Sequence, residues 1–388
     1  MRASHLAPLA GAALLLAGWA QIGWNATAGS AVPALHMRVK VPLGTVVQPL
    51  PEWSLHSLAS GEWQRAAALR VGPLSSAYQG AVRLRNSFYY AALGMSAVPT
   101  ILVGRDGQLL ERGYVEEYCS RDLAALRPRA EAWATRMRAL QDRVEARGQV
   151  FRYVLTPSKP AYQPGWIPQG TPCPGLADAP GKRVVLRDAF ARAGVHAVDT
   201  AAALDRARAA YPFELFPKGG THWNQVGAAV ATQALAASLN GTRAALVPFR
   251  FRVTGMSWQP EGTDRDLASI LNFLPGTIRY AVPQIAVDRA GDGGCRPVRL
   301  AWVAGSFSMN INAALQRTAC PPVGQTYFYW DMWHFTFEDG SRPRQEPVDP
   351  AQRAQALADA DAVIVEENER QAPESVHAAA LMQAMGVP

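Results

Sequence analysis

Ser306 is the residue best placed to act as a nucleophile. It follows the apolar segment 297–304, PVRLAWVA, and precedes the segment 309–317, which is expected to be a helix. This context predicts a turn from a strand into a helix, where backbone N–H groups around Gly305 and Phe307 can form an oxyanion hole. The glycine also lets the backbone approach a substrate carbonyl closely. A serine at such a turn is often only the N-cap of the helix, so this segment alone leaves both roles open.

A serine hydroxyl is unreactive without a base, and His222 is the best candidate for that base. It lies in the stretch GGTHWN, just before the Ala-rich segment 224–239, which is expected to be a helix. The other six histidines lie in less suitable places: His5, His36, His56, His196, His334 and His377. A histidine before a helix is commonly a capping or packing residue. The interpretation of His222 as a general base therefore depends on its combination with Ser306.

The segments that would position these residues alternate between strands and helices. Strands are expected at 150–155, 195–198, 297–304, 326–330 and 362–365, and helices at 120–147, 182–193, 200–210, 224–239, 309–317 and 351–360. This alternation predicts an α/β fold with a mostly parallel sheet and helices on both faces. Ligands of such sheets bind at the carboxyl ends of the strands, and the polar clusters TPSK, GSFS and EENE fall there. Within the first helix, Pro128 is expected to split off a short first turn.

The N-terminus predicts export from the cytoplasm. An apolar run over 6–24 is followed by small residues, and it is long for a signal peptide and marginal for a membrane span. We therefore expect 1–29 to be either a cleaved signal peptide or a retained membrane anchor. The Pro-rich stretch 30–94 is expected to be an irregular lead-in, and 95–388 to form the functional domain.

Charge and cysteine content narrow the function classes. The net charge of +7 comes from scattered arginines with no basic run, which argues against nucleic-acid binding. Four cysteines suit an oxidising compartment, and their spacing does not resemble a metal site. Cys295 and Cys320 are a plausible pair, which would leave Cys119 with Cys173. Four cysteines allow three pairings, and the sequence does not choose among them.

Five segments in order resemble one known family. HWN after a small turn, followed by a strand ending in GSFS, is similar to the SGNH hydrolase-like domain of the alginate O-acetyltransferase family, the AlgX/AlgJ type. Its motifs are roughly Asp-x-His-Trp and Gly-(Asp/Thr)-Ser-(Phe/Tyr)-Ser. Three further segments resemble the family: GRDGQLLERGYVEEYC, RGQVFRYVLTPSKPAYQPGWIP and DAVIVEENER. The likeness spans roughly residues 95–370.

The resemblance implies an SGNH-like α/β fold and an acetyl transfer. Ser306 would carry the acetyl group, and His222 would act as base. The acceptor would be a hydroxyl of an exopolysaccharide in the periplasm, and a membrane acyl-transfer protein in a membrane-associated complex would supply the acetyl group. No cofactor or metal is implied. Because the chain ends soon after EENE, the AlgJ-like architecture is expected rather than the AlgX-like one.

The chain departs from the family pattern at Gly220, where the family has the aspartate that orients the histidine. In a serine triad, loss of that acid costs about 10⁴-fold in rate. Asp199 and Asp331 are candidate replacements, and a backbone carbonyl could also hold the ring. The pattern also changes at Gly305, where the family has Asp or Thr.

These departures keep other interpretations open. The same chemistry with water as acceptor would make the protein a carbohydrate acetylesterase. A catalytically weak SGNH-like domain could instead bind polysaccharide or scaffold a secretion complex. Lys159 of TPSK is a candidate substrate contact, although a solvated or structural lysine fits its context as well.

Overall fold

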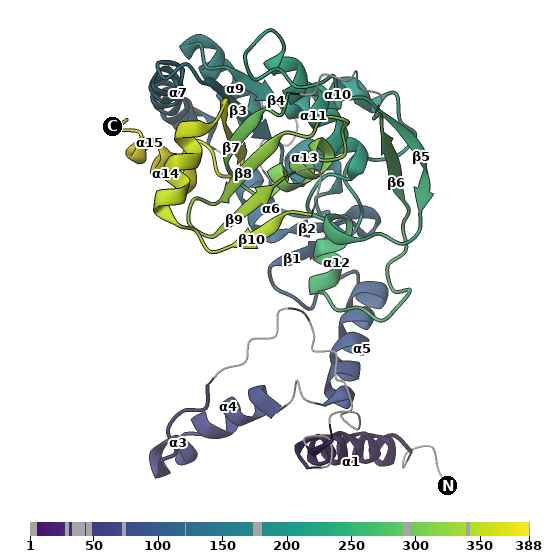
Figure 1. Ribbon diagram of the computed structural model, residues 1–388. Coiled ribbons are helices and arrows are strands. Elements are labelled where there is room, and N and C mark those ends of the chain that lie inside the picture. The colour runs from purple at the N-terminus through teal and green to yellow at the C-terminus, as the bar shows by residue number, and fades with distance from the viewer. Residues whose placement is uncertain are drawn as a thin grey trace. The chain divides into compact units, whose positions relative to one another are not determined.

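The computed structural model in Figure 1 describes residues 6–27, 31–32, 43, 49–71, 75–120, 122–173, 181–289, 296–338 and 342–387. The chain divides into two compact units. The first comprises Met1–Val103 and Asp266–Arg279, and the second comprises Gly104–Arg265 and Tyr280–Pro388. The Ser–His pair predicted from the sequence lies entirely in the second unit.

The first unit is mainly helical. Its elements are α1 (Leu6–Ala26), α3 (Leu55–Ala59), α4 (Glu62–Val71), α5 (Ser76–Leu93), β1 (Ile101–Val103) and α12 (Asp266–Ile270). The expectation of an irregular segment over 30–94 is therefore wrong for α3, α4 and α5. The side-chain amide of Asn86 in α5 donates to the carbonyl oxygen of Leu271 at 2.7 Å, which ties that helix to the end of α12. Within the described residues, no helix is long and apolar enough to cross a membrane.

A seven-stranded sheet forms the centre of the second unit. Its strand order is β10 (Arg344–Glu346), β9 (Trp333–Phe337), β8 (Val323–Phe328), β7 (Arg299–Ala304), β11 (Ala362–Asn368), β3 (Val150–Thr156) and β4 (Ala197–Asp199). The five strands from β8 to β4 are parallel, and β9 and β10 are antiparallel to their neighbours. The prediction of a mostly parallel sheet is confirmed, although β9 and β10 were not foreseen. The remaining strands are β2 (Leu109–Glu111) and the antiparallel pair β5 (Phe251–Ser257) and β6 (Val282–Val287).

Helices cover both faces of this sheet, as predicted. They are α6 (Arg112–Cys119), α7 (Leu123–Glu145), α8 (Lys159–Tyr162), α9 (Lys182–Ala193), α10 (Thr200–Arg208), α11 (Gln225–Leu239), α13 (Phe307–Leu315), α14 (Pro350–Asp359) and α15 (Val376–Ala384). Successive residues of a strand point to opposite faces. Accordingly, Trp302 of β7 packs with Leu235 of α11 and Ile311 of α13 in one core cluster. Its neighbour Val303 belongs to the opposite cluster, with α7, α9 and α15.

Two local predictions need correction. Pro128 lies inside one continuous helix α7, which begins after the N-cap Asp122 rather than after Ser120. A proline at this position removes only one helical hydrogen bond, and the buried face of α7 outweighs that loss. The final strand extends to Asn368, so that most of the EENE cluster lies within β11.

The disulfides follow part of the expected pattern. Cys119 at the end of α6 is bonded to Cys173. Cys320 is also disulfide-bonded, and Cys295 lies outside the described residues. No described cysteine is free, which agrees with an oxidising compartment.

Candidate active site

Ser306 and His222, which lie 84 residues apart in the chain, meet in the structure. His222 Nε2 lies 2.7 Å from Ser306 Oγ. Ser306 is the residue before α13, and only Gly305 separates it from the carboxyl end of β7, as predicted. With Nε2 unprotonated, the serine hydroxyl donates its proton toward the imidazole, which is the geometry that a general base needs.

The residues after His222 hold its loop against the core. Asn224 is the N-cap of α11 and accepts two backbone N–H groups of that helix, while its own amide donates to the carbonyl oxygen of Glu214 at 2.6 Å. Trp223 is fully buried and meets the Phe307 ring edge-on at 4.9 Å. The imidazole of His222 packs on the same Phe307 ring at 4.7 Å. Trp223 and Asn224 therefore hold in place the loop that brings the imidazole of His222 to Ser306.

Lys159 fixes the other side of the loop and is not a surface group. It is fully buried, and its ammonium donates to the carbonyl oxygens of Pro217 at 2.7 Å, Gly220 at 2.9 Å and Leu109 at 2.8 Å. A buried ammonium requires such acceptors, and the loop carbonyls require donors. The structure therefore gives Lys159 a structural role and corrects the expectation of a substrate contact.

The glycine at 220 is explained by a close approach of the backbone. A Cβ atom at Gly220 would fall far inside the contact distance of the Thr263 carbonyl oxygen and 3.1 Å from the carbonyl carbon of Asp264. These residues belong to the turn Gly262–Arg265. Asp264 is buried, and its carbonyl oxygen accepts a hydrogen bond from the Tyr280 hydroxyl at 2.8 Å. The turn that carries Asp264 thus occupies the space beside Gly220.

Neither acid proposed from the sequence reaches His222. Asp199 is the N-cap of α10 and accepts the backbone N–H of Ala202 at 3.0 Å. Asp331 is paired with Arg353, and its side chain is 69% exposed. Both carboxylates are thus engaged in local structure, and the expectation that one of them orients the histidine is corrected.

Two residues near Ser306 were not singled out from the sequence. The Cβ position of Gly305 lies 3.3 Å from Glu366 Oε2 and 3.5 Å from the Tyr329 hydroxyl oxygen. Burial raises the pKa of the Tyr329 hydroxyl, and the Glu366 carboxyl adds to that shift. Tyr329 also has a φ of 44°, an unusual conformation for a residue other than glycine. In the sequence, the aromatic-rich surroundings of Tyr329 did not indicate that it lies near Ser306.

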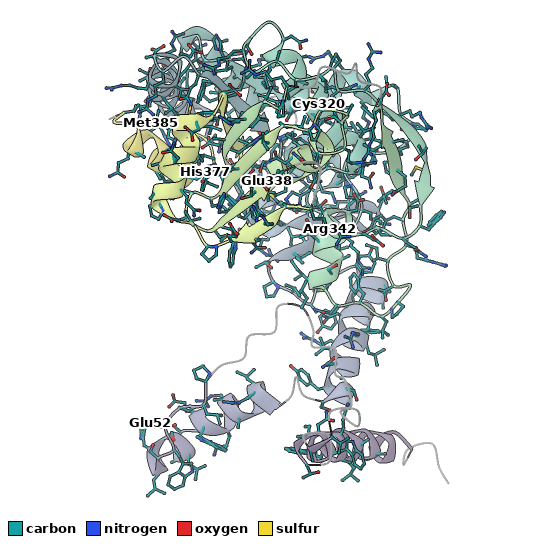
Figure 2. The ribbon with its side chains drawn as sticks, viewed as in Figure 1. Glu52, Cys320, Glu338, Arg342, His377 and Met385 are labelled. Atoms are coloured by element: carbon teal, nitrogen blue, oxygen red, sulfur yellow. A yellow bond between two sulfur atoms is a disulfide. The ribbon has the colours of Figure 1, made fainter. Side chains whose placement is uncertain are left out.

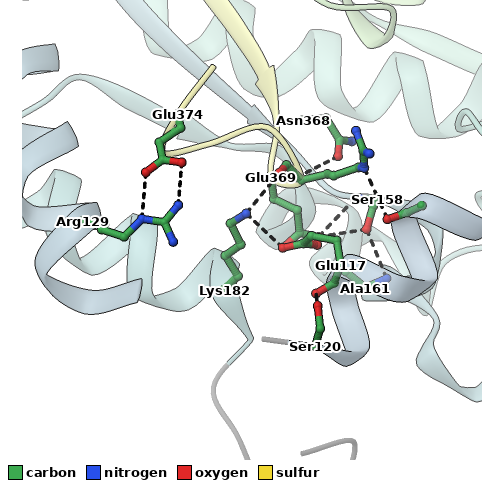
Figure 3. A network of polar contacts seen from close by, with 11 residues as sticks. Glu117, Ser120, Arg129, Ser158, Ala161, Lys182, Asn368, Glu369 and Glu374 are labelled. Atoms are coloured by element: carbon green, nitrogen blue, oxygen red, sulfur yellow. Dashed lines mark hydrogen bonds and ion pairs between the residues drawn. The ribbon is translucent and has the colours of Figure 1, made fainter. Parts of the chain in front are cut away.

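The clusters TPSK and EENE are joined by hydrogen bonds at the carboxyl edge of the sheet. The Thr156 hydroxyl donates to Glu366 Oε1 at 2.7 Å, and the Ser158 backbone N–H donates to Glu369 Oε1 at 3.1 Å. Figure 3 shows Glu369 beside Ser158, with the ion pair of Lys182 and Glu117 nearby. Three sequence clusters that the alternating pattern placed at one edge therefore do meet there.

The strand order, the serine after a central parallel strand and the histidine that reaches it define an SGNH hydrolase-like α/β domain. Residues 101–289 match the family model described as SGNH hydrolase-like domain, acetyltransferase AlgX. The chain therefore carries an AlgX-type SGNH hydrolase-like domain, and the predicted resemblance is confirmed. The matched range includes His222, whereas Ser306 lies beyond it.

Two solved structures that are similar to this chain can be compared with it. The O-acetyltransferase domain of Pseudomonas putida AlgJ is 21% identical and covers 75% of this chain and 100% of its own, with a TM-score of 0.47. Pseudomonas aeruginosa AlgX is 14% identical and covers 79% of this chain and 70% of its own, with a TM-score of 0.45. Among curated proteins, no significant match to the chain was found.

Proposed function

We propose that the protein is an exported serine O-acetyltransferase that acts on exopolysaccharide hydroxyl groups. The observation that carries this proposal is the 2.7 Å contact between His222 Nε2 and Ser306 Oγ, within a domain of the AlgX acetyltransferase type. The acetyl donor would be a membrane acyl-transfer protein, the acceptor an exopolysaccharide, and the compartment the periplasm.

In the first half-reaction, Ser306 Oγ attacks the carbonyl carbon of the donor acetyl group while His222 Nε2 takes the hydroxyl proton. The resulting oxyanion is stabilised by backbone N–H groups at the start of α13 and by the Tyr329 hydroxyl, which its raised pKa keeps protonated. Collapse of this intermediate breaks the bond to the donor, and His222 returns the proton to the leaving group. The product is acetyl-Ser306.

In the second half-reaction, a sugar hydroxyl attacks acetyl-Ser306 while His222 takes its proton. The second tetrahedral intermediate collapses to the O-acetylated sugar, and the proton returns to Ser306 Oγ. With water in place of the sugar, the same sequence is an esterase reaction. The two activities therefore share all their catalytic groups and differ in the acceptor.

Asp264 is the residue that we propose as the acid that orients His222. It is buried, and its backbone fills the position that a side chain at residue 220 would occupy. The acid would thus be supplied from the neighbouring turn rather than from the loop of the histidine. Loss of an orienting acid in a serine triad costs about 10⁴-fold in rate, so Asp264→Asn should lower kcat by at least roughly 100-fold without unfolding the protein. Unchanged kcat in this variant would exclude the role.

The proposed function is tested by acetyl release from p-nitrophenyl acetate with the full chain, Ser306→Ala and His222→Ala. We expect hydrolysis by the full chain and loss of it in both variants, with acetyl-Ser306 trapped in the wild type by rapid acid quench and mass spectrometry. Equal rates in all three proteins would refute the hypothesis that Ser306 and His222 are catalytic and would favour a binding or scaffolding domain.

The acceptor separates the two enzyme classes. Addition of an unacetylated anionic exopolysaccharide such as deacetylated alginate should increase turnover and produce acetylated sugar. If turnover is unchanged and free acetate is the only product at every acceptor concentration, the protein is an esterase.

A further inference from the structure

A glutamate carboxyl group lies buried directly behind the nucleophile turn. Glu366 of β11 is fully buried, and its Oε1 accepts the Thr156 hydroxyl at 2.7 Å. Its Oε2 lies 3.3 Å from the Cβ position of Gly305, the residue before Ser306. Among the described residues, Oε2 has no hydrogen-bond partner of ordinary geometry, although the backbone N–H groups of Gly305 and Ser308 lie close enough to lower the pKa of the carboxyl group. Buried polar atoms without such a partner are rare in folded proteins, and this one lies against the turn that precedes Ser306.

The backbone conformation of Tyr329 is a second unusual feature beside the turn at Gly305. The Tyr329 hydroxyl oxygen lies 3.5 Å from the Gly305 Cβ position, and Tyr329 and Trp330 both have positive φ angles, 44° and 68°. Residues in such sparsely populated conformations cost about 1–3 kcal/mol each and gather at functional sites. Glycine at 305 leaves room for both side chains to approach the turn that presents Ser306.

We propose that Glu366 is a positioning residue of the acyl-transfer site, which acts as a neutral carboxylic acid behind Ser306 while the acetyl oxyanion forms in front of it. This inference rests on the proposed function. The neutral acid supports the turn without opposing the negative charge that develops there. In the ionised form, two negative charges on the order of 6 Å apart at an effective dielectric constant of about 20 would slow the step roughly 100-fold.

The groups that surround Glu366 favour its neutral form. Burial raises its pKa to about 7 and Glu367 adds to this shift, whereas the Thr156 hydroxyl and the backbone N–H groups of Gly305 and Ser308 oppose it. The other titratable groups near it are Tyr114 of α6 and Tyr329 after β8, whereas Tyr153 of β3 and His377 of α15 contact the Glu367 carboxylate instead. His377, labelled in Figure 2, lies 3.0 Å through Nε2 from the backbone carbonyl oxygen of Glu366.

Glu367 provides a matched control on the same strand. It is also fully buried, but strand alternation directs it to the opposite face of the sheet, where it accepts the Tyr153 hydroxyl. Glu367→Gln thus removes a buried acid one residue away without touching the nucleophile turn. A general effect of losing a buried acid would appear equally in both variants.

The test is the pH–rate profile of p-nitrophenyl acetate hydrolysis from pH 5 to 9 with the full chain and with Ser306→Ala, each corrected for the hydrolysis measured without protein. We expect kcat to fall above about pH 7 as Glu366 ionises. In Glu366→Gln the alkaline fall should disappear, leaving at least roughly ten-fold more activity than wild type at pH 9 relative to the maximum. Glu367→Gln should keep the alkaline fall but move it to lower pH, because the variant removes a charge that raises the pKa of Glu366.

A second variant keeps the inference testable if Glu366→Gln does not fold. Thr156→Val removes a hydrogen bond that favours the carboxylate, so it should shift the alkaline limb to higher pH without abolishing activity. A profile that keeps its alkaline limb in Glu366→Gln and does not move in Thr156→Val would overturn the role of Glu366. If Ser306-dependent activity persists in that case, only this inference fails, whereas activity that survives Ser306→Ala refutes the proposed function itself.

Discussion

Restoring the family aspartate at position 220 should damage the enzyme rather than improve it. The sequence comparison alone suggests that Gly220→Asp would supply a missing catalytic acid. In the structure, a Cβ atom there would overlap the Thr263 carbonyl oxygen and lie 3.1 Å from the carbonyl carbon of Asp264. Both neighbours are backbone atoms, which cannot rotate away as a flexible side chain would. The clash therefore arises at the Cβ atom, before any carboxylate is considered.

The size of the effect follows from how far the backbone must yield. Carbon and oxygen atoms need more than 3 Å, so the loop or the turn must move by roughly 1 Å, and such overpacking typically costs about 1–3 kcal/mol. For a unit of this size the melting temperature should fall by roughly 2–10 °C. Since His222 is two residues away, a displacement of about 1 Å should lower kcat about 100-fold.

The assay compares melting temperature and p-nitrophenyl acetate turnover in Gly220→Asp, Gly220→Ala and Gly165→Asp. Gly220→Ala has the same steric conflict without the charge, and Gly165 has no atom within 4 Å of its Cβ position, so Gly165→Asp controls for the exchange itself. We expect both variants at 220 to lose stability and activity and the control to retain them. A Gly220→Asp enzyme that is faster than wild type with an unchanged melting temperature would refute this reasoning.

The remaining predictions concern the buried side chains of Glu366 and Lys159 and the half-buried side chain of Tyr329. Because the pKa of Glu366 is raised to about 7, its contribution to stability is complete below its ordinary value and is lost as pH rises through 7. Urea unfolding should therefore show Glu366→Gln gaining up to about 3 kcal/mol on wild type between pH 4.5 and 8, and a constant difference would contradict this. Lys159→Met leaves loop carbonyls without donors and should destabilise the protein by about 2–4 kcal/mol in the same measurement, whereas Lys218→Met, on a partly exposed lysine, should have little effect. Tyr329→Phe should lower kcat by about 10²-fold with little change in KM if its hydroxyl stabilises the oxyanion. An increase in KM with unchanged kcat would instead indicate a binding role.

The fold and the reacting pair were predictable because each depends on local patterns. The strand before Gly305 and the helix after Asn224 show clear apolar spacing, and both place polar residues at the carboxyl edge of the sheet. The pairing of Ser306 with His222 then followed from the chemistry that each needs from the other.

The supporting residues could not be predicted because their roles depend on burial and on contacts between distant segments. The sequence around Lys159 looks the same for a surface lysine as for a buried one, and only the carbonyls at 217–220 decide the matter. Likewise, Glu366 belongs to an acidic cluster that suggests a solvated end of a strand. The backbone contact that requires glycine at 220 involves a turn more than forty residues further along the chain.

The hydrogen bonds of Lys159 also constrain when the site can form during folding. One ammonium group joins the carbonyl of Leu109 to those of Pro217 and Gly220, which lie 50, 58 and 61 residues away from it. Such long-range closures are slow and are completed late, after local helices have formed. The loop that carries His222 therefore reaches its position beside Ser306 only when both flanking segments have docked, so a partly folded chain has no assembled Ser–His pair.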